Sequence, residues 1–334
     1  MTRISIITAI AFALMGPALL AGSDLAQAQQ KVSIPTLTPP ALPAFLRKES
    51  PAATVTGELT LPKNASGPVP AMVLLHGSGG LQGPSGANIK KWAATLNGWG
   101  VATLMVDSFG PRGVAATFAD QSKLSGYADV ADGLAALKIL GMDSRIDRDR
   151  IGVLGWSRGG TASLNTTLET LRRIIITDDL KFAVHVVLYG AAELQNRDRA
   201  TDKSPLLFFH GESDDYTPIG PAREFADWVQ SQGNPVTFVS YPNTYHDFDV
   251  QGGFSGLSKS TEVFIKCDMV VDVSIGRVIR LNHVNDPKTT PEAVRAYLGS
   301  CPGHGANYAF NPAARANAVE KVHDFLKQYL QIPG

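Results

Sequence analysis

The sequence lacks a surplus of charge of either sign, because 30 lysines and arginines balance 30 aspartates and glutamates. Proteins that bind nucleic acid or an anionic membrane surface usually carry a basic surplus. The balance therefore gives no support for either partner and favours a neutral or small polar ligand. With 334 residues, the chain is long enough to bury a sizeable core as one large domain or two small ones.

Cysteine is also scarce, since the chain contains only Cys267 and Cys301. Two sulfurs so far apart, with no Cys-x-x-Cys spacing, give little support for a zinc site. In an oxidising compartment such a pair is expected to form a disulfide, which stabilises by about 3–4 kcal/mol in the chain-entropy model. The alternative is two buried free thiols.

The apolar run near the N-terminus is short. It covers residues 4–15, follows Arg3, ends at Gly16-Pro17 and precedes small residues up to Ala28. This pattern is typical of a secretory signal peptide that is cleaved after Ala28. A membrane anchor is the alternative, but the run is shorter than the roughly 20 residues that a membrane span needs. We therefore expect residues 1–28 to be a signal peptide and the mature protein to be periplasmic or extracellular, without stable membrane insertion.

Residues 29–51 are rich in proline and contain the stretch IPTLTPPALPAF. Proline cannot donate a hydrogen bond to a sheet ladder, so this segment is expected to run extended over the surface. The folded domain is then expected to cover residues 52–334. Within it, residues 250–311 contain both cysteines, break the regular pattern and are predicted to be an excursion before the last helix.

Short apolar runs alternate with longer helix-like segments in this domain. Continuous apolar runs are expected for parallel strands covered on both faces, and the alternation predicts an α/β fold with a mostly parallel sheet between helices. The predicted strands are 54–61, 71–75, 101–106, 151–154, 182–188, 206–209 and 236–241. The predicted helices are 87–97, 127–140, 161–174, 221–232 and 312–330.

The stretch GWSRGG, residues 155–160, lies between one predicted strand and one predicted helix. Gly155-x-Ser157-x-Gly159 in this context is typical of a nucleophile elbow, where a strained turn holds the serine at the carboxyl edge of the sheet. The pattern alone arises by chance in glycine-rich chains, so its position carries most of the weight. Ser157 is the candidate nucleophile, and a small residue in a crowded turn is the alternative.

A serine hydroxyl needs a histidine to accept its proton and an acid to orient that histidine. In sheets of this kind the chain order is serine, acid, histidine. His246 lies in SYPNTYHDFD, shortly after the predicted strand 236–241, where a loop would bring it to the carboxyl edge. The other late histidines fall in the excursion, at His283 and His304, or within a helix, at His323. His246 is the candidate base, and a solvated loop histidine is the alternative.

The acid is sought just beyond the predicted strand 206–209, in LLFFHGESDDYTP. An acid at this edge can meet a histidine from the loop of the next strand. Asp214 is the preferred residue and Asp215 its competitor. The alternative is a pair of solvated acids before a helix near Pro218, because carboxylates are favoured at helix N-termini.

Backbone amides could hold the oxyanion that forms during ester cleavage. The predicted strand 71–75 ends in HGSGG, so the amide of Ser78 or Gly79 is one candidate donor and that of Arg158 is the other. A dinucleotide-binding turn is the competing interpretation, since Asp107 ends the next strand. However, Gln82 stands where that fingerprint requires glycine.

Arg112 lies in the stretch DSFGPRG after the predicted strand 101–106. Its planar guanidinium could clamp a substrate carboxylate, or it could pair with Asp107 and hold the loop. The structural interpretation is slightly favoured.

Five stretches, HGSGG, DSFGPRG, GWSRGG, GESDDYTP and YHDFD, resemble in order and spacing the dienelactone hydrolase family of α/β-hydrolases. The resemblance covers roughly residues 54–249 and the last helix. It implies an α/β-hydrolase fold and a triad matched here by Ser157, Asp214 and His246. Asp214 is favoured over Asp215, because the family pattern sets the acid four residues before a proline. Enzymes that open dienelactones use a cysteine nucleophile, so the serine here implies a carboxylesterase of similar build.

Together these features predict an exported serine hydrolase that cleaves small-molecule carboxylic esters through an acyl-enzyme, without a metal or organic cofactor. A serine peptidase of the prolyl-oligopeptidase type is one alternative, although the residues before 54 are too few for the large accessory domain of such enzymes. A non-catalytic binding protein on the hydrolase fold is the other, because fold does not imply function.

Overall fold

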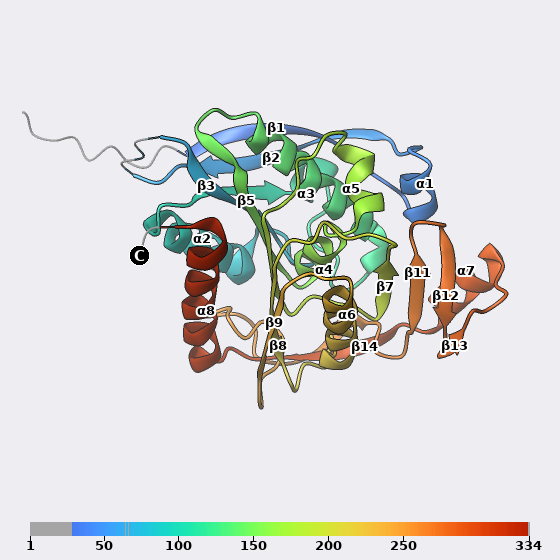
Figure 1. Ribbon diagram of the computed structural model, residues 1–334. Coiled ribbons are helices and arrows are strands. Elements are labelled where there is room, and N and C mark those ends of the chain that lie inside the picture. The colour runs from blue at the N-terminus through green and yellow to red at the C-terminus, as the bar shows by residue number, and fades with distance from the viewer. Residues whose placement is uncertain (1–28, 64, 66, 333–334) are drawn as a thin grey trace, which may run out of the picture.

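A computed structural model describes residues 29–332 except 64 and 66, and the predicted signal peptide at residues 1–28 lies outside this range. Eight strands form a central sheet in the order β1-β2-β4-β3-β5-β6-β8-β9 (Figure 1). β1 and β2 are antiparallel to their neighbours, and the strands from β4 to β9 in this order are parallel. The predicted α/β class with a mostly parallel sheet is confirmed. The strands are β1 (Gln29–Leu37), β2 (Ala52–Thr60), β3 (Val69–Leu75), β4 (Ala102–Asp107), β5 (Ile146–Trp156), β6 (Val184–Leu188), β8 (Leu206–Gly211) and β9 (Val236–Tyr241).

Helices cover both faces of this sheet because alternate strand residues point to opposite sides. In β3, Val73 packs with α3 and α4 on one face, whereas Leu74 packs with α2 and α8 on the other. Figure 1 shows α2 and α8 on one side of the sheet and α3 to α6 on the other. Within the described part of the chain, no helix has the length and apolar character needed to cross a membrane. The helices are α2 (Gly83–Gly98), α3 (Gly126–Gly141), α4 (Arg158–Asn165), α5 (Glu169–Ile175), α6 (Ile219–Ser231) and α8 (Pro312–Leu330).

The proline-rich segment 29–51 is part of the folded domain, which differs from the expectation that the domain begins near residue 52. β1 pairs with β2 from Gln29 to Leu37, and Phe45 of α1 (Leu42–Leu46) is fully buried. Pro35, the proline within β1, is tolerated because β1 is an edge strand, where a residue without an N–H group need not interrupt the hydrogen bonds to β2.

The predicted helix 161–174 is two helices, α4 and α5. The hydroxyl of Thr166 donates to the carbonyl of Ser163 at 2.8 Å, and that of Thr167 donates to Leu164 at 2.7 Å. Leu168 then adopts an extended conformation. Because these hydroxyls bond to the carbonyls of the last turn, they offer the backbone an alternative to continuing the helix.

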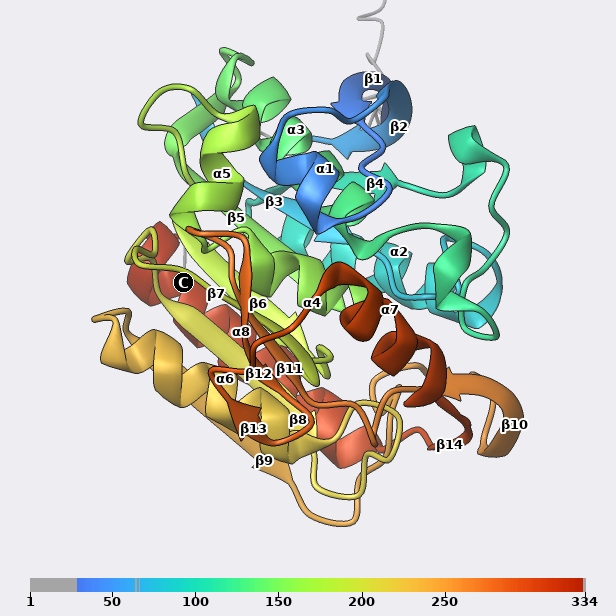
Figure 2. The ribbon, with the colours of Figure 1, turned by 90° about the vertical axis from the view of Figure 1, so that its right-hand side faces the viewer.

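The excursion forms two small sheets and a helix. β10 (Gly256–Val263) pairs with β14 (Gly303–Tyr308), and β11 (Met269–Asp272) pairs in parallel with β7 (Leu194–Arg197) of the main body. Cys267 and Cys301 form a disulfide within it. Its two ends lie side by side, because the amide of Asn311 donates to the carbonyl of Phe248 at 2.8 Å. Figure 2 shows these parts beside the main sheet, and the remaining elements are β12 (Arg277–Leu281), β13 (Val284–Asn285) and α7 (Pro291–Ser300).

Candidate active site

Ser157 lies in the sharp turn between β5 and α4, as the elbow pattern predicts. Its backbone has φ 52° and ψ −117°, a strained combination for a residue with a side chain. A Cβ atom on Gly155 would lie 2.1 Å from the carbonyl oxygen of Gly159, and one on Gly159 would lie 2.1 Å from that of Leu75. The two glycines of the motif are therefore required by the close approach of strand, turn and helix.

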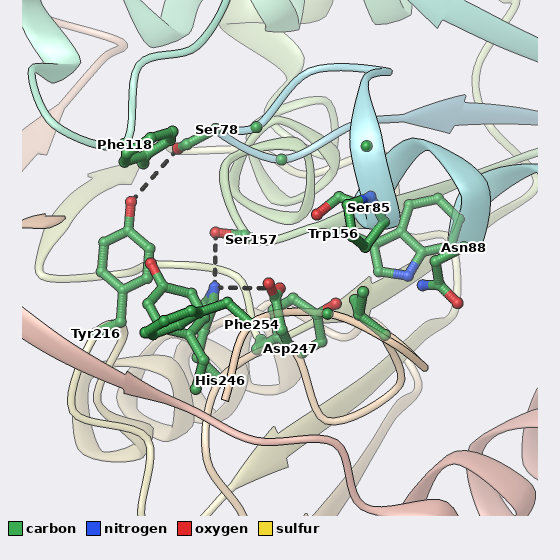
Figure 3. A pocket seen from close by; sticks show the side chains of 18 of the residues that line it. Ser78, Ser85, Asn88, Phe118, Trp156, Ser157, Tyr216, His246, Asp247 and Phe254 are labelled. Carbon is green, nitrogen blue, oxygen red and sulfur yellow. Dashed lines mark hydrogen bonds and ion pairs between the residues drawn. The ribbon is translucent and has the colours of Figure 1, made fainter. Parts of the chain in front are cut away.

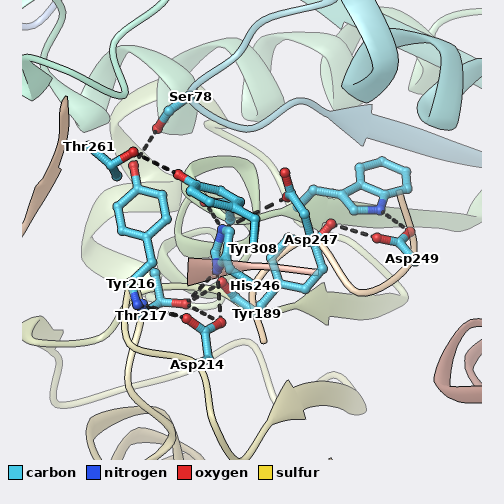
Figure 4. A network of polar contacts seen from close by, with 12 residues as sticks. Ser78, Tyr189, Asp214, Tyr216, Thr217, His246, Asp247, Asp249, Thr261 and Tyr308 are labelled. Carbon is cyan, nitrogen blue, oxygen red and sulfur yellow. Dashed lines mark hydrogen bonds and ion pairs between the residues drawn. The ribbon is translucent and has the colours of Figure 1, made fainter. Parts of the chain in front are cut away.

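His246 connects Ser157 to Asp214. Its Nε2 lies 2.9 Å from the hydroxyl oxygen of Ser157, and its Nδ1 lies 2.8 Å from a carboxylate oxygen of Asp214. Parallel pairing of β8 with β9 explains this meeting, because the loops after both strands emerge at the same edge. All three side chains are buried, and Figure 4 shows the contact between His246 and Asp214.

The two adjacent acids after β8 have separate partners. Besides His246, Asp214 accepts hydrogen bonds from the amides of Tyr216 and Thr217, both at 2.9 Å. Asp215 instead accepts from the backbone amide and the side-chain amide of Asn307 in β14. Asp214 therefore faces His246, whereas Asp215 connects the excursion to the main body.

Opposing effects set the pKa values of this buried pair. Burial alone would lower the pKa of His246, but the negative charges of Asp214, Asp247 and Glu193 raise it above its usual value. Burial alone would raise the pKa of Asp214, but the charge and hydrogen bond of His246 lower it. The arrangement favours a carboxylate beside an imidazole that readily takes up a proton.

The predicted oxyanion donors flank the serine. A Cβ atom on Gly77 would lie 3.3 Å from that of Ser157, so the peptide that leads to Ser78 approaches the nucleophile directly. Gly79 is further along the turn and lies near Ser85. Arg158 begins α4, where backbone amides have no partner within the helix. Of the two candidate donors in this turn, Ser78 is therefore the one next to the residue that approaches Ser157.

Arg112 holds neighbouring segments of the chain together, and its acidic partner is not the predicted Asp107. Its guanidinium forms a bidentate ion pair with Asp132, with distances of 2.7 and 2.9 Å, and also donates to the carbonyl of Leu37. Asp107 instead accepts from the backbone amide of Gly110 at 2.8 Å. Asp132 is a better partner because its side chain is completely buried and would otherwise carry an unpaired charge.

The late histidines other than His246 stay apart from the serine. His283 has a side chain that is 83% exposed and lies near Asp268 within the excursion. His323 packs against the ring of Trp99, with 4.7 Å between the ring centroids. His304 lies in β14.

Two cavities meet at Ser157. The main cavity has a volume of about 500 Å³, and Figure 3 shows Trp156, Tyr216, Asp247 and Phe254 around it. The side cavity has a volume of about 240 Å³. Their dimensions suit a small organic molecule with its reacting group at the serine. The side cavity is lined by Tyr127, Ser157, Arg158, Glu193, Tyr216 and Phe264, among others.

The sequence analysis did not single out several buried polar groups around the site. Asp249 is completely buried and accepts a hydrogen bond from the indole of Trp156 at 3.0 Å. It also accepts one from the hydroxyl of Tyr189 at 2.6 Å (Figure 4). Asp247 lies with an oxygen 4.0 Å from Nε2 of His246. Both acids belong to the stretch YHDFD, so their closeness to His246 along the chain was the available signal. Glu193 is 4% exposed, and no motif marks it.

A model of the dienelactone hydrolase family matches residues 55–262, which is more than half of the chain. Among solved structures, a dienelactone hydrolase-like promiscuous phosphotriesterase from metagenomic libraries is similar, with a TM-score of 0.55 and 15% identity over 92% of this chain and 100% of its own. A putative dienelactone hydrolase from Klebsiella pneumoniae has a TM-score of 0.48 and 16% identity over 66% and 89% of the two chains. A thermophilic esterase from Thermogutta terrifontis has a TM-score of 0.48 and 18% identity, over 60% of this chain and 82% of its own.

Proposed function

Because the chain belongs to the dienelactone hydrolase family, we propose that it hydrolyses carboxylic esters with Ser157 as nucleophile, His246 as base and Asp214 as the acid that orients His246. The observation that carries this proposal is the continuous hydrogen-bonded path from the serine hydroxyl through the imidazole to the carboxylate. Its order and roles match those of serine hydrolases.

The first half of the reaction forms an acyl-enzyme. The hydroxyl oxygen of Ser157 attacks the ester carbonyl while Nε2 of His246 accepts its proton. The tetrahedral intermediate then breaks its bond to the alcohol, which leaves with the proton from Nε2. Asp214 keeps the imidazole in the tautomer with hydrogen on Nδ1 and stabilises the imidazolium that forms transiently.

The second half repeats these steps with water. Nε2 of His246 accepts a proton from water as the water oxygen attacks the acyl carbon, and the carboxylic acid leaves as Ser157 regains its proton. In both halves we assign the oxyanion to the backbone amides of Ser78 and Arg158. Fixed donors aimed at this oxygen stabilise the transition state without reorganisation.

We also propose that the protein is exported after removal of residues 1–28. The disulfide between Cys267 and Cys301 supports this, because disulfides persist mainly in oxidising compartments outside the cytoplasm.

A fluorophosphonate probe together with two substrate types tests the proposed chemistry. The purified protein is expected to hydrolyse p-nitrophenyl acetate, and mass spectrometry is expected to find the probe on the peptide that contains Ser157. Faster cleavage of aminoacyl amides than of esters would favour a peptidase. Absence of both labelling and turnover would identify a binding protein on the hydrolase fold.

The pH dependence of turnover is expected to report the charges around His246. Only the neutral imidazole accepts a proton, so kcat/KM should fall as the pH drops through the raised pKa of His246. Asp247→Asn removes one of the negative charges that raise this pKa, and the acid limb of the profile should move to lower pH. The measurement is kcat/KM against pH with a neutral ester. An exposed control, Glu49→Gln, should leave the limb in place, and an unmoved limb in Asp247→Asn would contradict the assignment.

A further inference from the structure

The side cavity contains a buried carboxylate that the proposed mechanism does not use. Glu193 lies just before β7 and is 4% exposed. One of its oxygens accepts a hydrogen bond from the amide of Ala192 at 2.9 Å, and its carboxylate forms no ion pair within the described residues. Burial raises the pKa of Glu193 to about 7. A cation placed in the cavity beside it would favour the ionised form of this carboxyl group.

Among the described residues that line the two cavities, no lysine or arginine side chain is free to pair with Glu193. Arg158 is the one lysine or arginine among the described residues that line either cavity. Its guanidinium pairs with Asp129 at 2.7 Å and donates to the carbonyl of Leu124 at 2.6 Å. The main cavity adds the carboxyl group of Asp247. Burial raises the pKa of Glu193 to about 7 and that of Asp247 to about 6, so the surroundings of Ser157 are negative on both sides above about pH 7, which disfavours anionic substrates there.

Three aromatic side chains also line the side cavity. Tyr127, Tyr216 and Phe264 line it together with Glu193. The faces of such rings attract cations, and an alkylated ammonium group suits them better than a primary amine because it is weakly hydrated and brings no N–H donors that need acceptors. Aromatic faces with one carboxylate are the chemistry that recognises a quaternary ammonium.

We propose that the side cavity is a subsite for a quaternary ammonium group of the ester substrate, with Glu193 as its counter-ion. This inference rests on the proposed ester hydrolysis at Ser157, since the same residue lines the side cavity and would hold the reacting carbonyl. It names the substrate class as cationic esters and places anionic esters among the poorest substrates.

The excursion builds part of this subsite. Phe264 directly follows β10, and the amide of Met269 in β11 donates to the carbonyl of Glu193 at 3.2 Å. Cys267, which lies between these two residues, is held by the disulfide to the end of α7. The excursion thus supplies one aromatic wall and fixes the backbone that carries the carboxylate.

Matched esters of acetic acid test the inference. Acetylcholine carries the cation, 3,3-dimethylbutyl acetate is its neutral isostere, and 3-sulfopropyl acetate is anionic. At about pH 8, where a carboxyl group with a pKa near 7 is ionised, the native protein should prefer the choline ester over its isostere by about tenfold in kcat/KM. Glu193→Gln should reduce this ratio at least fivefold. A purely structural role would lower turnover of all three esters alike and leave the ratio unchanged, which would overturn the proposal.

Binding without turnover separates this proposal from the proposed function. Tetramethylammonium should bind to the native protein and to Ser157→Ala in calorimetry, and binding should weaken at least fivefold in Glu193→Gln. The matched control Glu49→Gln changes an exposed acid on the chain segment after α1 and should bind as the native protein does. Binding that depends on Glu193 in a protein that cleaves no ester would retain the subsite and refute the hydrolase. Turnover of neutral esters without binding of tetramethylammonium would retain the hydrolase and refute the subsite.

Discussion

Ser157→Ala is expected to lower kcat for ester hydrolysis by about 10⁴-fold or more, because among the described residues Ser157 alone has its hydroxyl within hydrogen-bond distance of Nε2 of His246. The fold should persist, since alanine is smaller than serine and keeps the same backbone. Initial rates with p-nitrophenyl acetate measure the loss, and thermal unfolding checks the fold. Ser231→Ala, an exposed serine on α6, is the matched control and should retain native rates.

His246→Ala is expected to have a similar effect, and the double variant should lose little more than either single one. Residues that act as one catalytic unit show such non-additivity, because after the first change the second residue no longer contributes to catalysis. Losses that multiplied in the double variant would mean that the two residues act independently, contrary to the 2.9 Å contact between Nε2 and the hydroxyl oxygen.

Asp249→Ala is expected to lower the free energy of unfolding by about 4 kcal/mol. The carboxylate accepts hydrogen bonds from the side chains of Asn88, Trp92, Trp156 and Tyr189 at 2.6–3.0 Å in a fully buried setting. Each buried donor that loses its acceptor costs about 1–3 kcal/mol, and a water in the vacated space would satisfy some of them. The midpoint of urea unfolding at fixed pH measures the loss.

Two further variants show whether this loss has the proposed cause. Asp249→Asn retains one acceptor oxygen and should be intermediate in stability. Asp227→Ala changes an exposed acid of α6 and should alter the free energy of unfolding by less than about 0.5 kcal/mol. A loss of that small size in Asp249→Ala would mean that the four donors are satisfied without the carboxylate.

The sequence predicted the sheet and the meeting of Ser157, Asp214 and His246 because both depend on local signals. Parallel strands are short apolar runs, and their ends are the places where loops bring side chains to one edge. The choice of Asp214 over Asp215 came from the resemblance to a family. The structure gives a physical reason for this choice, because Asp214 contacts His246 and Asp215 accepts a hydrogen bond from Asn307.

Features that depend on contacts between distant segments were not predictable in this way. The edge position of β1 depends on pairing with β2, and the proline content of residues 29–51 suggested only an extended surface segment. Arg112 pairs with Asp132, twenty residues further along the chain, and no spacing rule identifies such a partner. Glu193 carries no motif, and its significance comes from burial and from rings on three segments that are far apart in the sequence.

The meeting of the two ends of the excursion, where Asn311 bonds to Phe248, has a consequence for how such a chain can diversify. A segment whose ends coincide can be lengthened, shortened or exchanged with little added cost of loop closure, while the strands and α8 keep their positions. The excursion, residues 250–311, is in this sense an exchangeable segment, called the cassette below. Because the cassette supplies Phe264 and fixes the backbone of Glu193, its exchange would alter which substrates enter while the serine, histidine and aspartate remained in place.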